Sequence, residues 1–291
     1  MKSKATEIIN GTYLSVPTSP TDKVFSPCTK SIWMQSKKEQ FYSQSLSNSK
    51  EPESLLKSSL QMIKFPAEGK HFILGTSSSS RKAIVDALQW KYLQMSPDID
   101  GKFNFDISCL KSFEQTCSYL IIIEKAIRCS NPTDLPLLIA KAKADALLNK
   151  LREVNDGESY ILLSADQIVL FGDTVREKPV DEAEAIAFLS SYSDSSVSTV
   201  SAVVITELPS GAQTSGVDVA TVHWDTLSEE VVRRVVSRGE IFSSAGGFRV
   251  EDEDLTPLIR RVDGSVDSVM GLPVDMTVAL IEEVIKLSGR P

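Results

Sequence analysis

From His71 onward, short apolar runs alternate with helical patterns along nearly all of the remaining chain. The run His71–Gly75 predicts a strand, and apolar residues spaced over 83–88 share one face of a helix that follows it. The same helical spacing returns over residues 135–151 and 274–287. Because strands and helices interleave, the sequence predicts an α/β fold with a mixed, twisted sheet flanked by helices.

Asp166 lies between two further β-like runs. Residues 160–163 and 167–171 each predict a strand, so the Asp166 carboxylate is expected at a strand end. A helix is predicted over residues 181–190. A carboxylate at a strand end can face a cleft and there hold a divalent ion or activate water, although most charged strand ends are simply solvated surface.

A β-hairpin is predicted in the second half of the chain. Two β-branched runs, residues 199–206 and 217–224, are separated by a turn that contains Pro, Ser and Gly at 209–211. Thr226 and Glu229 then have the spacing of a capping box, so the next helix is expected to begin there.

The first 69 residues differ in character from the rest. They are rich in Ser, Thr and Lys and show no sustained apolar period. They carry nine Lys against six acidic residues, whereas residues 70–291 have a net charge of −11. An organelle-targeting peptide is one interpretation, but these residues contain no Arg. We therefore expect a flexible, disordered extension over 1–69 and one folded domain over 70–291.

Charge and hydropathy exclude two classes of partner. With 31 Lys and Arg against 39 Asp and Glu, the chain is acidic, which disfavours binding to nucleic acid polymers. The longest aliphatic run, residues 120–123, is far shorter than the ~20 residues that span a bilayer, so no membrane segment is expected. Four cysteines without CxxC spacing, and no apolar signal sequence, predict a reducing, cytoplasmic location.

Histidine chemistry is limited by the composition. The chain has only His71 and His223, so a metal site would have to rely on carboxylates, which favours Mg²⁺ or Mn²⁺ as the ion. A Ser/His/Asp triad would have to use His223, and no GxSxG motif accompanies it. Hydrolysis by such a triad is therefore disfavoured.

A hydroxyl-rich turn, residues 76–80, separates the first predicted strand from its helix. Its backbone N–H groups, with Thr76 and Ser78, could hold an anion, and Arg81 could grip phosphate oxygens bidentately. No Walker pattern is present, and a plain Ser-rich linker would look the same, so the turn alone leaves both interpretations open. Lys178 precedes a rigid proline and could neutralise phosphate charge, but a solvated lysine is the simpler alternative.

Taken in order, these segments resemble the Maf family of nucleoside triphosphate pyrophosphatases over roughly residues 72–287, and their motifs are closest to its plant-type branch. Ser79 and Ser80 replace a Pro and an Arg of the bacterial pattern. The resemblance implies a Maf/inosine-triphosphatase-like fold and a homodimer. Its motifs are residues 74–81, Lys143-Ala144, Asp166-Gln167, Lys178-Pro179, Ala245-Gly246-Gly247 and residues 266–273.

The resemblance also implies a reaction, in which water cleaves a nucleoside triphosphate between the α and β phosphates to give a monophosphate and pyrophosphate. Its catalytic residues would be Asp166, Glu124 and Lys178, and the first two would hold Mg²⁺ or Mn²⁺. The base remains open among dTTP, UTP and modified nucleotides such as 7-methyl-GTP, and the Gln167 amide is a reasonable discriminator. The substrate-binding residues would be Thr76, Ser78, Arg81, Lys143 and Gln167.

One family motif is split in this chain. Residues 97–100 and 124–128 resemble its two halves, and 23 residues, 101–123, lie between them as an unusual insertion. Its apolar side chains would be costly to leave in water. The alternative function is therefore a nucleotide-binding regulatory protein, in which the insertion displaces Glu124 and impairs catalysis.

Overall fold

The computed structural model describes residues 60, 63–96, 131–152 and 158–289. Most of the predicted extension, the insertion at 101–123 and Glu124 lie outside these residues. Within them, no helix is both long and apolar enough to cross a bilayer.

Seven strands of the described residues form one mixed sheet in the order β2-β1-β3-β5-β6-β7, with β4 paired to β3. β1 runs parallel to β2 and β3, whereas β3, β5, β6 and β7 follow one another as antiparallel neighbours. The predicted α/β fold with a mixed sheet is thereby confirmed. The strands are β1 His71–Gly75, β2 Leu93–Gln94, β3 Tyr160–Phe171, β4 Thr174–Arg176, β5 Ser196–Leu208, β6 Gln213–Trp224 and β7 Ile259–Asp263.

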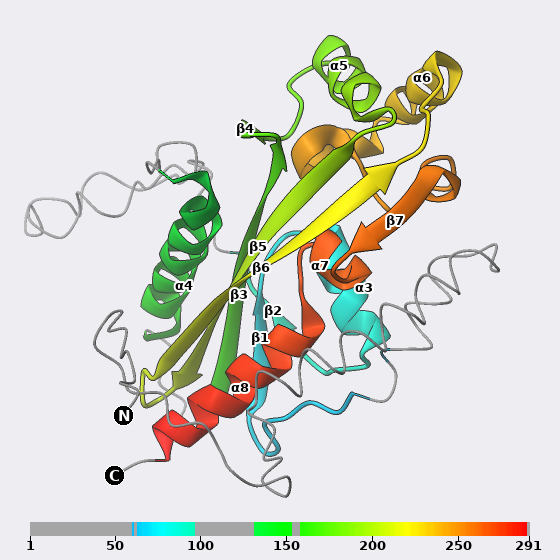
Figure 1. Ribbon diagram of the computed structural model, residues 1–291. Helices are drawn as coiled ribbons and strands as arrows, with labels where there is room; N and C mark the ends of the chain where they lie inside the picture. The colour runs from blue at the N-terminus through cyan, green and yellow to red at the C-terminus, as the bar shows by residue number, and fades with distance from the viewer. Residues whose placement is uncertain (1–59, 61–62, 97–130, 153–157, 290–291) are drawn as a thin grey trace, which may run out of the picture.

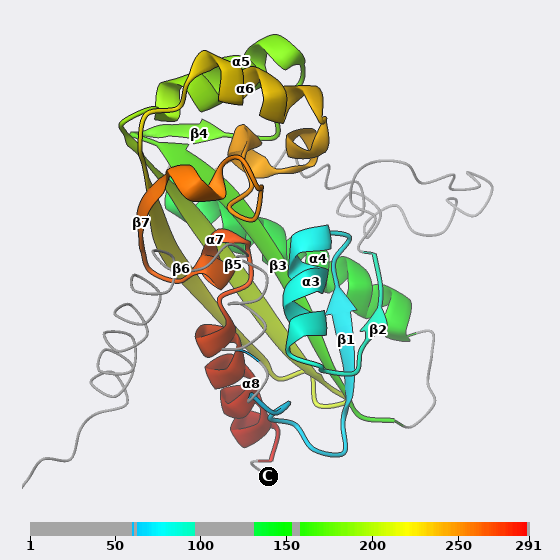
Figure 2. The same ribbon diagram turned by 90° about the vertical axis from the view of Figure 1, so that its right-hand side faces the viewer.

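Helices cover both faces of the sheet and one of its ends (Figure 1). α4 lies on one face, α3 and α8 lie on the other, and α5 and α6 gather at the end near β4 (Figures 1 and 2). The helices are α3 Ser79–Ala87, α4 Leu135–Arg152, α5 Glu182–Tyr192, α6 Glu229–Ser237, α7 Val266–Val269 and α8 Val274–Ser288. Short 3₁₀ turns at Pro132–Asp134, Glu240–Ser243, Ala245–Gly247 and Thr256–Leu258 connect them.

The alternation of side chains along β3 divides the core between the two faces. Ile161 and Leu163 pack with residues of α3 and α8, whereas Leu162 packs against α4. The same alternation continues toward the end of the strand, so Asp166 faces α4 and Gln167 faces the opposite side. Two adjacent residues of one strand therefore reach separate groups of neighbours.

The register of β1 on β3 explains where an open site forms. The two strands pair from His71 opposite Tyr160 to Gly75 opposite Ser164, and there β1 ends. Asp166 lies just beyond this point, on a stretch of β3 that β1 no longer covers. Polar groups at the carboxyl end of a parallel strand, beside the start of a helix, commonly face a ligand crevice in α/β proteins.

β3 runs without a break through Asp166, so the predicted pair of separate strands is wrong. Asp166 keeps its place in the ladder opposite Ala202 of β5. Its carboxylate Oδ1 lies 2.6 Å from Lys143 Nζ of α4, and this pairing allows a charged residue to remain inside a strand. The carboxylate therefore projects from the side of a continuous strand and not from a strand end.

The predicted hairpin is confirmed, because β5 and β6 pair along almost their whole length. The predicted cap of the helix after it is wrong by two residues. α6 begins at Glu229, and Ser228, rather than Thr226, accepts a hydrogen bond from the backbone N–H of Val231. Thr226 instead donates its hydroxyl to Asp194 at 2.8 Å, which anchors the loop before the helix.

A buried carboxylate at the far end of β5 links the N-terminal part of the fold to the hairpin. Glu207 is 2% exposed and lies 2.6 Å from the Lys70 ammonium. Burial alone would raise the pKa of Glu207, but hydrogen bonds from Lys70 and Ser210 outweigh it and hold the pKa below its usual range. The charged form of Glu207 therefore stabilises the folded state.

We expect Glu207→Gln to lower the free energy of unfolding near neutral pH by about 1.5–3 kcal/mol, the range for hydrogen bonds to charged groups. Because the folded pKa is depressed, this contribution is complete above the unfolded value of about 4.3 and disappears as the pH falls through the folded pKa. Urea unfolding at several pH values checks it. Glu158→Gln, which changes an exposed carboxylate, is the control. If the loss of unfolding free energy in Glu207→Gln did not depend on pH, the charged form of Glu207 would not be what stabilises the fold.

Candidate active site

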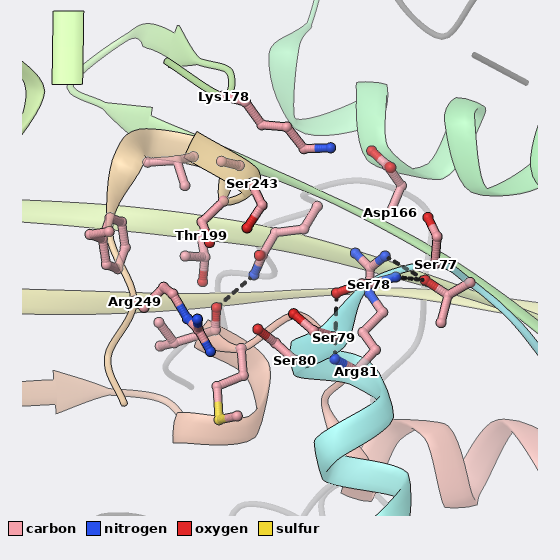
Figure 3. A pocket seen from close by; sticks show the side chains of 18 of the residues that line it. Ser77, Ser78, Ser79, Ser80, Arg81, Asp166, Lys178, Thr199, Ser243 and Arg249 are labelled. Carbon is pink, nitrogen blue, oxygen red and sulfur yellow. Dashed lines mark hydrogen bonds between the residues drawn. The ribbon is translucent and has the colours of Figure 1, made fainter. Parts of the chain in front are cut away.

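A cavity of about 650 Å³ opens beside β3 where β1 ends, a volume typical of small-ligand sites. Its walls come from the turn before α3, from α4, from the segment after β4, and from the region between α6 and α8 (Figure 3). The predicted substrate and catalytic residues within the described chain all line it. They are Thr76, Ser78, Arg81, Lys143, Asp166, Gln167 and Lys178.

The hydroxyl-rich turn is organised by its own side chains. Thr76 Oγ1 accepts a hydrogen bond from the backbone N–H of Ser78 at 3.1 Å. Ser78 is the N-cap of α3, and its Oγ accepts from the backbone N–H of Arg81 at 3.4 Å. These contacts fix the first turn of α3 at the cavity wall, where a helix N-terminus favours negative charge.

Arg81 ties three segments together beneath the turn. It is 7% exposed, and its Nε donates to the carbonyl oxygen of Gly271 at 2.8 Å. Its Nη1 donates to the carbonyl oxygen of Ala165 at 3.1 Å, on the strand that carries Asp166. The guanidinium thus positions the cavity wall, while its predicted direct contact with phosphate stays a prediction.

The ion pair between Lys143 and Asp166 lies in the cavity wall formed by α4 and β3. The two side chains are 12% and 6% exposed. Ala140 and Ala144 of α4 pack closely on β5, and Ser164 donates its hydroxyl to the Ala140 carbonyl at 2.8 Å. Small residues let α4 approach the sheet, and this approach brings the Lys143 ammonium onto the carboxylate.

Lys178 reaches the same site from the segment that follows β4, and Figure 3 shows its ammonium directed toward Asp166. It is exposed, and no hydrogen bond or ion pair reaches it from residues 63–96, 131–152 or 158–289. The backbone around it is held, because Gly246 N–H donates to the Glu177 carbonyl at 3.0 Å. A fixed backbone with an available ammonium suits contact with an anionic ligand.

Arg176 anchors the strand that leads to Lys178. Its guanidinium lies over the rings of Phe171, Phe188 and Tyr192, at 4.3, 4.6 and 4.8 Å from their centroids. It also donates to Ser191 Oγ at 2.6 Å. These contacts hold β4 against α5 and so place Lys178.

Gln167 faces the opposite side of β3 from Asp166 and holds the segment around α7. Its Nε2 donates to the carbonyl oxygens of Ser268 and Val269 at 3.0 and 2.9 Å, and to Ser201 Oγ at 3.0 Å. The amide nitrogen is thus engaged in positioning α7 at the cavity wall. A role for Gln167 in discriminating the base stays a prediction.

Arg249 and Glu251 were not predicted from the sequence, but they also line the cavity. Figure 3 shows Arg249 on the side away from Asp166. Arg249 Nε and Nη2 donate to Glu251 Oε1 at 3.1 and 3.0 Å. The only hint in the sequence was their position two and four residues after Gly247, the last residue of the Ala245-Gly246-Gly247 motif.

Both histidines lie away from this cavity. His223 Nε2 is 2.7 Å from Asp263 at the β6–β7 edge, and His71 pairs with Glu158 at the start of β1. Neither lines the cavity. This placement agrees with the expectation that a histidine triad is not used.

The chain matches the family model described as Maf-like protein over residues 71–284. A 7-methyl-GTP pyrophosphatase of Dictyostelium discoideum is 33% identical over 214 residues, which cover 73% of this chain and 96% of the relative. A dTTP/UTP pyrophosphatase of Syntrophomonas wolfei is 24% identical over 208 residues, covering 72% and 94%. A dTTP/UTP pyrophosphatase of Deinococcus radiodurans is 30% identical over 152 residues, covering 52% and 73%.

Proposed function

The chain belongs to the Maf-like protein family, and we propose that it is a hydrolase that cleaves a nucleoside triphosphate between its α and β phosphates. The observation that carries this proposal is the carboxylate of Asp166, 2.6 Å from Lys143, in a cavity that also contains Lys178 and a helix N-terminus. A base for water and cations for phosphate are thus present in one site. The names of the relatives support a pyrophosphatase of this kind.

In the proposed reaction, the oxygen of water forms a bond to the α-phosphorus, and the bond from that phosphorus to the α–β bridging oxygen breaks. The products are a nucleoside monophosphate and pyrophosphate. Asp166 orients the water and accepts its proton, because its carboxylate is the acidic group on the α4 side of the cavity. Lys143 holds that carboxylate in place until the substrate arrives.

The leaving pyrophosphate gathers negative charge as the bond breaks, and the site offers groups that stabilise it. Lys178 is directed into the cavity, and the first turn of α3 offers its N-terminus there. Thr76 and Ser78 shape this turn, and Arg81 braces it against β3. We propose that the triphosphate lies along these groups.

A divalent cation is part of the proposal. In the described part of the chain, no group of three or more His, Cys, Asp or Glu side chains is placed so that it could hold a metal ion. Mg²⁺ and Mn²⁺ nevertheless need only one or two carboxylates when phosphates and water complete their coordination, and Asp166 fits that requirement. Asp166, with Glu124 from outside the described residues, would hold the ion. When bound, it would offset phosphate charge.

Substrate choice and assembly go beyond the family assignment. We propose a purine triphosphate of the 7-methyl-GTP type as substrate, because the relative of that name matches at 33% identity and over 96% of its own length. A homodimer and a cytoplasmic location stay predictions of the sequence. The alternative function is nucleotide binding without turnover, with catalysis impaired by the insertion at 101–123.

We expect Lys178→Ala to lower kcat/KM by about 10- to 100-fold, which corresponds to the loss of one hydrogen bond to a charged phosphate. The loss would appear in KM if the contact exists in the ground state, and in kcat if it forms only in the transition state. Steady-state pyrophosphate release measures both. Lys141→Ala, at an exposed position of α4, is the control. An unchanged kcat/KM in Lys178→Ala would mean that Lys178 does not contact the substrate.

A further inference from the structure

A glutamine on the short edge strand β2 holds the hydroxyl-rich turn from outside the cavity. Gln94 Nε2 donates to the carbonyl oxygen of Thr76 at 3.1 Å. Because a carbonyl oxygen can only accept hydrogen bonds, the amide nitrogen of Gln94 is the atom that faces it. Gln94 is exposed and does not line the cavity. Any effect of Gln94 on a ligand must therefore act through the turn.

Backbone pairing fixes the place of Gln94. It lies opposite Leu74 in the parallel pair of β1 and β2, and the Met95 N–H donates to the Leu74 carbonyl at 3.1 Å. Figure 2 shows β2 beside β1 at the edge of the sheet. The side chain of Gln94 is thus held within reach of Thr76, which directly follows β1.

Thr76 is engaged on its backbone as well as on its side chain, and it is only 4% exposed. Its N–H donates to the Leu74 carbonyl at 3.1 Å, and its Oγ1 accepts from the Ser78 N–H at 3.1 Å. With the hydrogen bond from Gln94 to its carbonyl, these contacts fix the orientation of the peptide group between Thr76 and Ser77.

The orientation of this peptide group determines where the Ser77 N–H points. In a planar trans peptide group, the carbonyl and the following N–H point in opposite directions. The Thr76 carbonyl points to β2, and β2 and β3 lie on opposite sides of β1. The Ser77 N–H is therefore directed toward the β3 side, where the cavity opens and which Ser77 helps to line. Within the described residues, this N–H donates to no acceptor.

We propose that Gln94 is a positioning residue, which aims the Ser77 N–H at a non-bridging oxygen of the phosphate that water attacks. This inference rests on the proposed function, because it assumes that a triphosphate occupies the cavity. Figure 3 shows Ser77 on the same side of the cavity as Asp166, the proposed base. The negative charge of the phosphate strengthens such a hydrogen bond, and a donor fixed in advance needs no reorganisation when the ligand binds.

Loss of the Gln94 amide would release the peptide group. The Thr76 carbonyl would then lack its partner, so the peptide group could rotate and turn its oxygen toward the cavity. A carbonyl oxygen and a phosphate oxygen are both acceptors and cannot bond to each other. Gln94 therefore favours the one orientation of the turn in which an N–H faces the phosphate.

NMR spectroscopy of the full chain labelled with ¹⁵N-serine tests the proposal without turnover, with α,β-methylene-GTP and Mg²⁺ as the probe. The signal of the Ser77 amide is identified by its absence in Ser77→Ala. We expect its proton resonance to move downfield when the analogue binds, because a hydrogen bond to phosphate forms. Gln94→Met, which keeps the length but loses the donor, should lose most of this shift. It should also bind the analogue about 3- to 10-fold more weakly, the scale of one neutral hydrogen bond.

Two further variants separate the donor from a merely structural role. Gln94→Lys supplies a donor again and should recover both the shift and the affinity. Tyr92→Phe is the matched control, because it removes a hydrogen bond to Asp86 that lies near Gln94 in sequence but does not reach the turn. It should leave both measurements unchanged.

An unmoved Ser77 signal in the presence of bound analogue, or an equal shift in Gln94→Met, would overturn the proposal. A Gln94→Lys variant that behaves like Gln94→Met would also overturn it, because the donor would then not be what matters. Should Gln94→Met not fold, Gln94→Glu replaces it with the same expected losses. Pyrophosphate release is measured separately: a Gln94-dependent shift without release would refute only the proposed reaction. If the analogue did not bind, the proposed function would be refuted and this inference with it.

Discussion

Replacing Asp166 with Asn is expected to lower kcat for pyrophosphate release by about 10²-fold or more, the usual scale for a lost acid–base group. Asn has nearly the same shape and can still accept the hydrogen bond from Lys143, so the fold should be retained. It cannot take a proton from water at neutral pH, and it is a poorer ligand for a divalent cation. Steady-state kinetics, with circular dichroism to confirm folding, measures the effect.

Asp173→Asn is the matched control for this experiment. Asp173 lies in the exposed turn between β3 and β4 and does not line the cavity, so its loss should leave kcat unchanged. If the Asp166 variant kept full turnover, Asp166 would have no place in the mechanism. A similar loss in both variants would point to a general effect of charge.

Gly246→Ala is expected to lower the free energy of unfolding by about 2–5 kcal/mol, the sum of a left-handed backbone and an overpacked core. Gly246 has φ +70°, and a Cβ there would lie 2.7 Å from Val169 Cγ1. Its N–H and carbonyl also bond Glu177 and Tyr192, so the change should displace the segment that carries Lys178. Urea unfolding and kcat/KM measure the two consequences.

Gly211→Ala separates the two causes. Gly211 has φ +74°, but a Cβ there meets nothing within 4 Å, so only the backbone strain of about 1–2 kcal/mol is expected. Adding Val169→Ala to Gly246→Ala should recover part of the difference, through a coupling of about 1 kcal/mol or more between residues in contact. If the two Gly→Ala variants lost the same free energy of unfolding, or if Val169→Ala showed no coupling with Gly246→Ala, the contact between the new Cβ and Val169 would be relieved without strain.

Local patterns in the sequence predicted the main elements of the fold. The apolar run of β1, the helical spacing of α4 and α8, and the turn between β5 and β6 each specify their own structure without distant contacts. β2, with two residues, and β7, whose charged side chains are all exposed, were missed. Such short edge strands depend on the neighbour with which they pair and have little pattern of their own.

In the candidate site, too, local patterns could be predicted, whereas contacts between residues distant in sequence could not. Asp166 was identified but placed at a strand end, because the compensating Lys143 lies 23 positions away in sequence and its effect requires the packed helix. Glu251 was not predicted for a related reason. Its carboxylate accepts a hydrogen bond from Ser80, which lies 171 positions away in the sequence. Arg81 was identified, but its bond to the Gly271 carbonyl depends on a distant loop. Residue types could be predicted from motifs, whereas their partners could not.

The proposed reaction is tested most directly by identifying the products that the full chain forms from 7-methyl-GTP, GTP, UTP and dTTP with Mg²⁺ or Mn²⁺. Phosphorus NMR distinguishes pyrophosphate from inorganic phosphate in one spectrum. The proposed reaction yields equal amounts of nucleoside monophosphate and pyrophosphate, and Asp166→Asn should form neither at a comparable rate. Release of phosphate with a nucleoside diphosphate, or tight nucleotide binding with no product at all, would contradict it.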